Sequence, residues 1–231
     1  MNEEFDALFF NQPLYGIAAT VLLYVAALLL RSKWPWLHPL FMTCTFLMVL
    51  VLATDTYDSY QIGGEWVTFF LGPATVALGV PLYKHFRTIK RHFKAIVVGV
   101  VVGSLSSLAA VWGLLFVLDS SKEMMLSMLP KSVTAPVSVG IAKQLGGIPE
   151  LAAVFAVLTG LFGSIMGPAL LKCIGIKHDV AIGTAIGTSS HGIGTARVIR
   201  DSDLQGSISS VAMGLTAIIT SILVVPLYYL W

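Results

Sequence analysis

The stretch Ala185-Ile-Gly-Thr-Ser-Ser-His-Gly-Ile-Gly-Thr-Ala-Arg197 gathers glycines, hydroxyl side chains, a histidine and an arginine within an otherwise strongly apolar chain. Lipid does not tolerate unsatisfied backbone groups, so irregular polar sequence at membrane depth occurs only where it lines a cavity or is enclosed by protein. The stretch therefore predicts a discontinuous or re-entrant helix at which function is concentrated.

The composition around this stretch predicts an integral membrane protein. Of the 231 residues, 56% are hydrophobic and 11% are charged, and the mean hydropathy is +0.85. Soluble domains carry roughly 25% charged residues. We expect an all-α polytopic membrane protein in one integral membrane domain, residues 1–231, with about six to eight transmembrane helices of roughly 20 residues each. The apolar stretches lie at about 14–30, 39–54, 66–83, 95–118, 125–143, 151–172, 180–199 and 206–230.

The charged residues predict the orientation in the cell membrane. Residues 84–94 contain bases and no acid, whereas acids predominate before residue 7 and in segments 55–65 and 119–123. By the positive-inside rule, we expect the N-terminus outside and a cytoplasmic loop at 84–94. A role of this loop in binding a nucleotide or partner is the less favoured alternative.

Two further bases bear on the second half of the chain. If every apolar stretch crossed the bilayer, Lys172 and Lys177 would lie outside, against the positive-inside rule. If 125–143 and 180–199 are both re-entrant, these lysines become cytoplasmic, together with Arg197 and Arg200. We prefer the re-entrant arrangement.

Three apolar segments combine helix-breaking and polar residues. The first, Leu71 to Tyr83, contains Pro73 and Pro81, each of which removes a backbone donor. Thr75 is its candidate for substrate binding. The segment is either a kinked packing helix or part of a site.

The second segment, Leu129-Pro-Lys-Ser-Val-Thr-Ala-Pro136, places Lys131 between two prolines. A lysine deep in a bilayer is costly unless it is paired or hydrated, which makes it a functional candidate. The alternative is an interfacial lysine whose long side chain reaches water from a helix start.

The third segment is the stretch quoted first. A broken helix exposes backbone N–H groups at its positive end, which suits a carboxylate. Arg197 could hold such a carboxylate in two hydrogen bonds, and His191 could take up a proton near neutral pH. The alternative is close helix packing through Gly183 and Gly187, which does not explain His191 or the paired serines.

Other functional classes find little support. Buried acids are nearly absent, so a sodium or other cation site is not expected, and no metal or cofactor is implied. The motifs HExxH, GxGD and GxSxG are missing, so we expect no enzyme. The net charge of +2 gives no indication of nucleic acid. Cys44 and Cys173 lie in apolar segments without paired spacing and are expected to be small core residues. Internal duplication is a structural expectation, because Leu71–Ala77 and Leu129–Ala135 match only at their ends.

At these segments the chain resembles the LrgB/CidB family, and the spacing agrees across nearly its whole length. Leu129 to Pro136 resembles the family's LPKSVTTPI, Gly146-Gly-Ile-Pro149 its GGIP, and Gly187 to Ala196 its GTASHALGTA. Gly63 to Tyr83 resembles its region ending in PLY. Ala135 and Ser189 depart mildly from the pattern, and both remain small.

The resemblance implies two classes of function. Plastid members exchange glycolate and glycerate, and some bacterial members are implicated in pyruvate uptake with a small membrane subunit of the LrgA/CidA type. The older bacterial interpretation is a holin/antiholin-like pore or regulator of murein hydrolase export, autolysis and programmed cell death. A homo-oligomer is expected in either class.

The residues favour a carrier. Short polar breaks suit a compact binding site for a small monocarboxylate better than the long polar lining of a wide pore. We predict alternating access, with proton coupling through His191. The predicted substrate-binding residues are Lys131, Ser132, Thr134, Ser189, Ser190, His191, Arg197 and Thr75, and the predicted helix breaks are Pro73, Pro130, Pro136, Gly187, Gly192 and Gly194.

Overall fold

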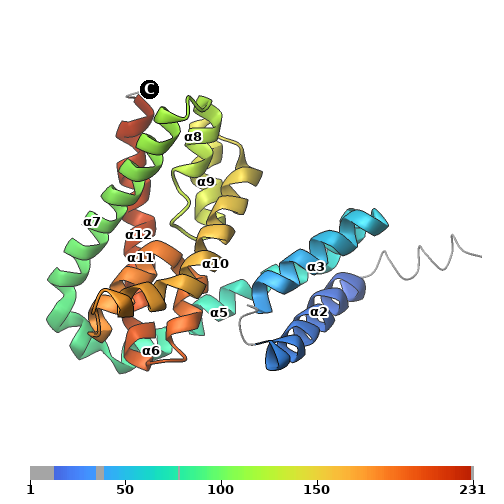
Figure 1. Cartoon of the computed structure of the whole chain (residues 1–231), viewed down its shortest axis with the longest axis horizontal. Coiled ribbons are helices and arrows are strands. Elements are labelled where there is room, and N and C mark those ends of the chain that lie inside the picture. The colour runs from blue at the N-terminus through green and yellow to red at the C-terminus, as the bar shows by residue number, and fades with distance from the viewer. Residues whose placement is uncertain (1–12, 35–38, 78, 230–231) are drawn as a thin grey trace, which may run out of the picture. The chain divides into compact units, whose positions relative to one another are not determined.

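The computed structural model describes residues 13–34, 39–77 and 79–229, without the side chains of Leu71, Ala74, Thr75 and 227–229. Every regular element in this part of the chain is a helix (Figure 1). The helices long and apolar enough to cross a membrane are Pro13–Lys33, Phe86–Val117, Pro149–Cys173 and Asp203–Pro226, and a shorter apolar helix spans Pro39–Thr54. The chain is an all-α polytopic membrane protein, as the sequence predicts.

The chain divides after Ala77 into two compact units. The first contains α2 (Pro13–Lys33), α3 (Pro39–Thr54), α4 (Tyr57–Phe69) and α5 (Leu71–Ala77). Glycines let α2 and α4 touch, because a Cβ on Gly63 would lie 2.6 Å from the Cα of Gly16. This division leaves the prediction of one integral membrane domain untested, since a compact unit need not fold alone.

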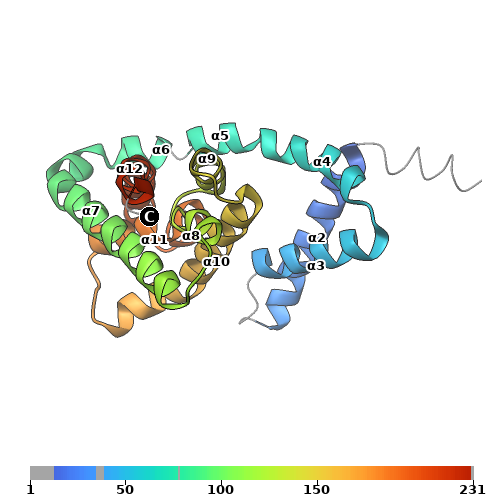
Figure 2. The ribbon, with the colours of Figure 1, turned by 90° about the horizontal axis from the view of Figure 1, so that it is seen from above.

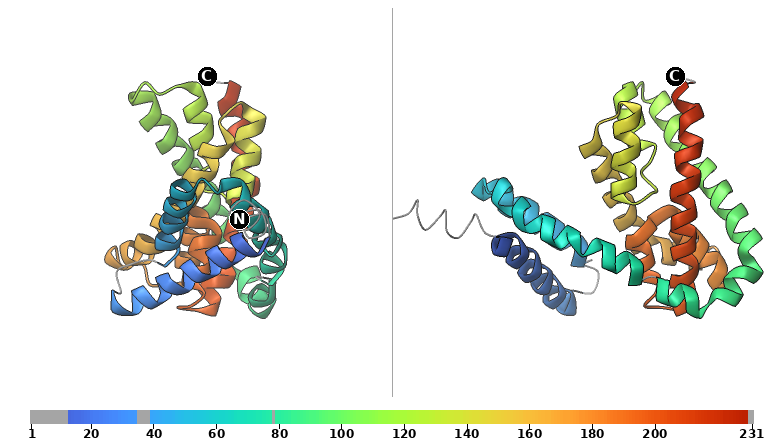
Figure 3. Two further views of the ribbon diagram at one scale, coloured as in Figure 1. Left: turned by 90° about the vertical axis from the view of Figure 1, so that its right-hand side faces the viewer. Right: turned by 180° about the vertical axis from the view of Figure 1, so that it is seen from behind.

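The second unit contains the predicted polar breaks. Its longest helices, α7 and α12, contact each other and run in the same direction, while α10 runs opposite to them (Figures 1 and 3). Figure 2 shows α12 nearly end-on, with α7 on one side and α9 on the other. Its helices are α6 (Gly79–Lys84), α7 (Phe86–Val117), α8 (Lys122–Met128), α9 (Ala135–Leu145), α10 (Pro149–Cys173), α11 (Asp179–Val198) and α12 (Asp203–Tyr229).

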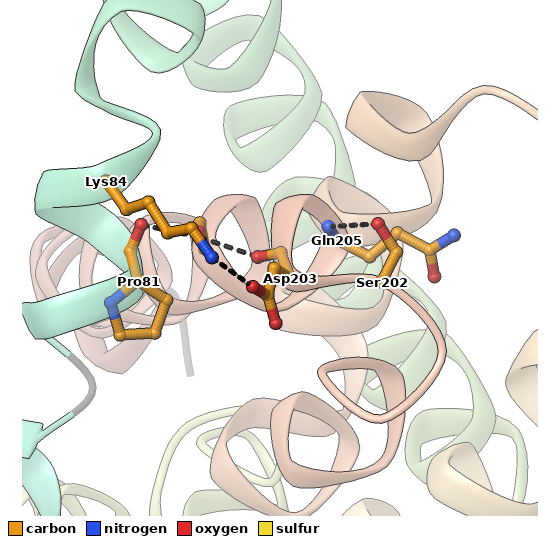
Figure 4. Close-up of polar contacts among 6 residues, drawn as sticks. Pro81, Lys84, Ser202, Asp203 and Gln205 are labelled. Atoms are coloured by element: carbon orange, nitrogen blue, oxygen red, sulfur yellow. Dashed lines mark hydrogen bonds and ion pairs between the residues drawn. The ribbon is translucent and has the colours of Figure 1, made fainter.

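The predicted loop at 84–94 is helical instead. Lys84 ends α6 and Phe86 begins α7, so nearly all the basic residues lie on the first turns of α7. Charge predicts which residues avoid lipid but not their conformation, and Lys and Arg favour helices. Figure 4 shows α6 held against the start of α12: Lys84 Nζ lies 2.7 Å from Asp203 Oδ2, and Ser207 Oγ donates to the Pro81 carbonyl at 2.8 Å.

The segment predicted at 125–143 forms a hairpin, called here the first hairpin (residues 122–145). It consists of α8, an irregular break at 129–134, and α9. After α9 the backbone N–H of Ile148 donates to Ser127 Oγ at 2.7 Å. This hydrogen bond brings the chain back to the helix from which it left, so the first hairpin folds back on itself.

The stretch at 180–199 forms a second hairpin, the whole of α11 (Asp179–Val198). The helix reverses at His191, whose φ of 39° and ψ of −134° are not helical. After the reversal, a Cβ on Gly194 would meet the Ile186 side chain, and Asp179 accepts a hydrogen bond from Gln205 Nε2 at 2.7 Å. Entry and exit of the second hairpin therefore lie side by side.

The two hairpins enter the second unit from opposite ends. One core cluster packs α8 against the later halves of α7 and α12, and another packs the start of α11 against their earlier halves. The linkers correspond: Asp119 and Gly175 have φ of 50° and 81°, and Ser121 and His178 each accept a hydrogen bond from a backbone N–H of the following helix. Each of the two oppositely directed helices α7 and α10 is thus followed by a hairpin, and we interpret these two halves as an inverted repeat.

The prediction that the two cysteines are core residues was wrong. Cys44 and Cys173 are free, and both are exposed at the protein surface. In a membrane protein an apolar helix face turns to lipid as readily as to other helices, so an apolar neighbourhood in sequence does not imply burial in the core.

Candidate functional site

The tip of the first hairpin holds Lys131 beside two serines. The Lys131 ammonium donates to Ser107 Oγ of α7 at 3.4 Å and to Ser132 Oγ at 3.5 Å, and the two serine oxygens lie 2.9 Å apart. No carboxylate among the described residues pairs with this ammonium. The prolines on either side keep the backbone out of a helix, which lets Lys131 and Ser132 project from the tip.

The depth of this cluster follows from its place on α7. Ser107 precedes the last residue of α7, Val117, by ten residues, which corresponds to about 15 Å along the helix axis. This is half the thickness of a hydrocarbon core of about 30 Å. Lys131 is therefore expected near mid-membrane, where an uncompensated lysine costs about 3 kcal/mol.

The part of the second hairpin before the reversal at His191, called its first limb (residues 179–190), ends with Thr188, Ser189 and Ser190. Ser189 Oγ and Ser190 Oγ lie 2.9 Å apart, and Thr188 Oγ1 donates to the Thr184 carbonyl in its own helix. Ser190 is fully buried and packs against Gly163 of α10, where any side chain would collide with its hydroxyl. The glycine thus brings the two helices together at the hairpin tip.

Both tips line one cavity of about 1490 Å³ within the second unit. Its walls come from α7, the first break, α10 and the first limb of α11, and they are mostly apolar. The ionisable residues that line it, among those described, are Lys131, His92 and His178, and none is an acid. Its hydroxyl-bearing lining residues are Ser106, Ser107, Ser132, Thr159, Thr184, Thr188, Ser189 and Ser190.

His191 does not line this cavity. Its ring is buried against α10, where Nε2 lies 2.9 Å from the Ala156 carbonyl oxygen. Gly160 provides the space, because a Cβ there would lie 2.6 Å from His191 Cε1. The structure gives His191 a role in fastening the reversal of α11 to α10, and proton coupling through it stays a prediction.

Arg197 and Thr134 also lie outside the cavity lining. The Arg197 guanidinium lies 2.7 Å from Asp201 Oδ1, one helical turn further along, at the partly exposed end of the second hairpin. An arginine already paired in this way is a poor candidate for a carboxylate clamp. Thr134 is the N-cap of α9 but makes no capping hydrogen bond through its side chain.

The predicted helix breaks differ in their outcome. Pro73 and Pro136 lie in the first turns of α5 and α9, where a missing N–H costs nothing, and Pro130 lies in the first break. The helix is continuous through Gly187, which packs against the Ser209 carbonyl of α12, as the packing alternative predicts. Gly192 and Gly194 follow the reversal rather than make it. The side chain of Thr75 lies outside the part that the structure describes.

Sequence reasoning missed Ser107, His92 and His178. The adjacent serines Ser106 and Ser107 inside a long apolar helix were the available signal, because paired hydroxyls are unusual on a surface that faces lipid. The histidines were counted only as part of the charge pattern. Their place in the cavity depends on the inverted repeat, which brings the α10–α11 linker beside α7.

Comparison with known proteins identifies the family. A model described as the LrgB-like family matches residues 20–230. The chain belongs to the LrgB-like family. This confirms the resemblance stated from the sequence motifs.

Two relatives of similar length each share about a third of the sequence. The chain is 37% identical to the uncharacterized protein YwbG of Bacillus subtilis, over 87% of this chain and 91% of that protein. It is 34% identical to the holin-like protein CidB of Staphylococcus aureus, over 95% and 97% of the two chains. No solved structure matches this LrgB-like protein.

Proposed function

We propose that this LrgB-like protein is a carrier of small organic anions rather than an enzyme. The observation that supports the proposal is the Lys131 ammonium, which lines a cavity between helices long enough to cross a membrane, with hydroxyl partners and no carboxylate among the described residues. A lysine in such a place is costly without a partner. An anionic substrate would supply that partner.

The helix that follows adds to the attraction for an anion. α9 begins at Ala135, four residues after Lys131, and the side chain of its N-cap residue, Thr134, leaves the first N–H groups uncapped. The positive end of a helix stabilises negative charge by about 0.3–1 kcal/mol. No described residue of α9 lines the cavity, so its positive end is expected to add to the attraction of Lys131 for a carboxylate without contacting it.

The other groups at the tips favour a hydroxycarboxylate or similar monocarboxylate. Ser107 and Ser132 adjoin the ammonium, and Ser189 and Ser190 line the same cavity from the second hairpin. Hydroxyls both donate and accept hydrogen bonds, so they suit a substrate hydroxyl as well as a carboxylate. The described lining contains no acid that would bind a cation.

Alternating access is the proposed mechanism. Many secondary transporters are inverted repeats whose discontinuous helices meet at the substrate site, and two such repeats can exchange roles to open either side. With the basic segment 84–94 in the cytoplasm and the N-terminus outside, the mouth at His92 and His178 would be cytoplasmic. Uptake of a monoanion against an inside-negative potential costs about 2.3 kcal/mol per 100 mV, which a cotransported proton would cancel.

The alternative is an oligomeric pore, or a regulator of murein hydrolase export, autolysis and programmed cell death. The printed name of the Staphylococcus aureus relative, holin-like protein CidB, supports this alternative more directly than it supports a carrier. Such a pore needs a polar lining shared among several copies, with or without a small LrgA/CidA-type subunit. The cavity of one chain, with polar groups mainly at two tips, supports the carrier.

Proteoliposomes distinguish the two functions. We expect saturable counterflow of labelled glycolate, with kcat/KM about ten- to a hundredfold lower in Lys131→Gln, because a hydrogen bond to a charged group contributes about 1.5–3 kcal/mol. Lys143→Gln is the matched control, since Lys143 is exposed on α9 and does not line the cavity. Unsaturable leakage of unrelated dyes, graded by size, would refute the carrier.

A further inference from the structure

The cavity that holds Lys131 has a second group of ionisable side chains at its other end. His92 of α7 and His178 of the α10–α11 linker line this cavity with their ring centroids 6.0 Å apart and their planes at 64°. His92 precedes Ser107 by fifteen residues on α7, or about 22 Å along the axis. One two- or three-carbon acid cannot touch both places, so the histidine pair is separate from the Lys131 cluster.

We propose that His92 and His178 form a second anion subsite at the mouth of the cavity, which captures a carboxylate when the pair carries a proton. The inference rests on the proposed carrier and adds a pH-dependent entry step. Among the described lining residues, these two are the histidines, and imidazole is the side chain that proteins commonly use to exchange a proton near neutral pH.

The hydrogen bonds of the pair assign the two rings different roles. His178 Nδ1 accepts the backbone N–H of Val180 at 3.3 Å and so caps α11. This fixes the proton of neutral His178 on Nε2, and a second proton on Nδ1 would break the cap. His92 makes no hydrogen bond among the described residues, so it can accept the additional proton. The pair then presents N–H donors on both rings to one carboxylate.

The charges around the mouth favour an anion. On α7 the neighbours of His92 are Arg91 and Lys94, and the end of α10 and its linker contribute Lys172 and Lys177. The ionisable groups on the remaining elements here are Lys84 and His85 by α6, Asp179 at the start of α11, Arg197, Arg200 and Asp201 at its exit, and Asp203 on α12. The three acids are engaged, since Asp179 accepts from Gln205, Asp201 pairs with Arg197 and Asp203 pairs with Lys84.

A carboxylate bound between the two rings would favour the imidazolium, because an opposite charge a few ångström away stabilises the charged form. Anion and proton therefore bind cooperatively, and by linkage each increases the affinity for the other by the same factor. The step is balanced: one carboxylate and one proton bind to the neutral pair, and both leave together when the anion moves on.

The test is the pH dependence of glycolate counterflow in proteoliposomes with equal pH on both sides. Glycolate stays ionised from pH 5.5 to 7.5, while the protonated fraction of an ordinary imidazole falls about tenfold. We expect the half-saturating glycolate concentration of the wild type to rise by up to about tenfold over this range. It should become independent of pH in His92→Gln.

Two variants make the outcome decisive. His178→Asn removes the second imidazole but retains a residue favoured at N-caps, so it should also lose the pH dependence without unfolding α11. His85→Gln, a histidine at the start of α7 that does not line the cavity, should retain it. Unchanged pH dependence in His92→Gln, or none in the wild type, would overturn the proposal. Absence of saturable counterflow at every pH would instead refute the carrier itself.

Discussion

At the scale of single residues, the structure separates side chains that meet a ligand from those that shape the site. Lys131 lines the cavity, whereas His191 is buried against the Ala156 carbonyl and Arg197 is paired with Asp201. All three are polar residues next to helix-breaking sequence. Sequence alone gives no way to distinguish them, because the difference lies in which neighbours the fold supplies.

The contact between His191 and Gly160 leads to a first prediction. In Gly160→Ala the new Cβ would lie 2.6 Å from His191 Cε1, so the ring must leave the Ala156 carbonyl. We expect a loss of about 1–3 kcal/mol of stability, as for overpacking of a core. Thermal unfolding of the purified protein in detergent measures it.

The control for this substitution is Gly214→Ala on α12, where a Cβ would meet nothing within 4 Å. It should leave the unfolding temperature unchanged or raise it slightly, because alanine favours helix over glycine by up to about 1 kcal/mol. If the two alanine substitutions changed the unfolding temperature equally, the space that Gly160 leaves for the His191 ring would not be important for holding α11 against α10.

At the scale of elements, the two hairpins were partly predictable. Prolines on either side of Lys131 indicated the first break, and the structure places irregular backbone at 129–134. In the second hairpin the sequence predicted helix breaks at the glycines Gly187, Gly192 and Gly194. The chain instead reverses at His191. Positive φ in a histidine costs about 1–3 kcal/mol and persists only where surrounding contacts enforce it. Those contacts come from α10.

The return of the first hairpin depends on Ser127. Its hydroxyl accepts from Ile148 N at 2.7 Å and donates to the Glu123 carbonyl at 2.6 Å, and the side chain is fully buried. Ser127→Ala leaves the Ile148 N–H without its partner, at a cost of about 1–3 kcal/mol. We expect faster amide hydrogen exchange across residues 145–150 and a lower unfolding temperature.

Ser221→Ala provides the comparison for that experiment. Ser221 donates only to the Ala217 carbonyl of its own helix among the described contacts, so its loss leaves no N–H unpaired. Little change in stability is expected there. If Ser127→Ala behaved like Ser221→Ala, the hydrogen bond to Ile148 would not be what closes the first hairpin.

At the scale of the whole molecule, composition and apolar length were enough to predict an all-α polytopic membrane protein. An internal duplication was expected, but the inverted repeat could not be located in the sequence, because its halves share geometry rather than sequence. Asp119 corresponds to Gly175, and the capping Ser121 corresponds to His178. Different residues thus perform the same local task. A sequence alignment of the two halves does not detect this correspondence, whereas the backbone angles and hydrogen bonds show it.

The inverted repeat and the positive-inside rule together predict which side each linker occupies. Because both hairpins fold back, Lys143 on α9 is expected outside and Lys177 in the cytoplasm, with Lys90 on α7 also cytoplasmic. If every apolar stretch crossed the membrane, Lys143 and Lys177 would exchange sides while Lys90 stayed. These two positions therefore distinguish hairpins from full crossings.

Cysteine labelling of intact cells tests this topology. In a background with Cys44→Ser and Cys173→Ser, a membrane-impermeant maleimide should label Lys143→Cys and spare Lys177→Cys and Lys90→Cys until the membrane is permeabilised. All three lysines are exposed in the structure, so failure to react reports the side and not burial. Labelling of Lys177→Cys alone, with both Lys143→Cys and Lys90→Cys spared, would contradict the hairpins. Labelling of Lys90→Cys would reverse the orientation, and the mouth at His92 and His178 would then face outward.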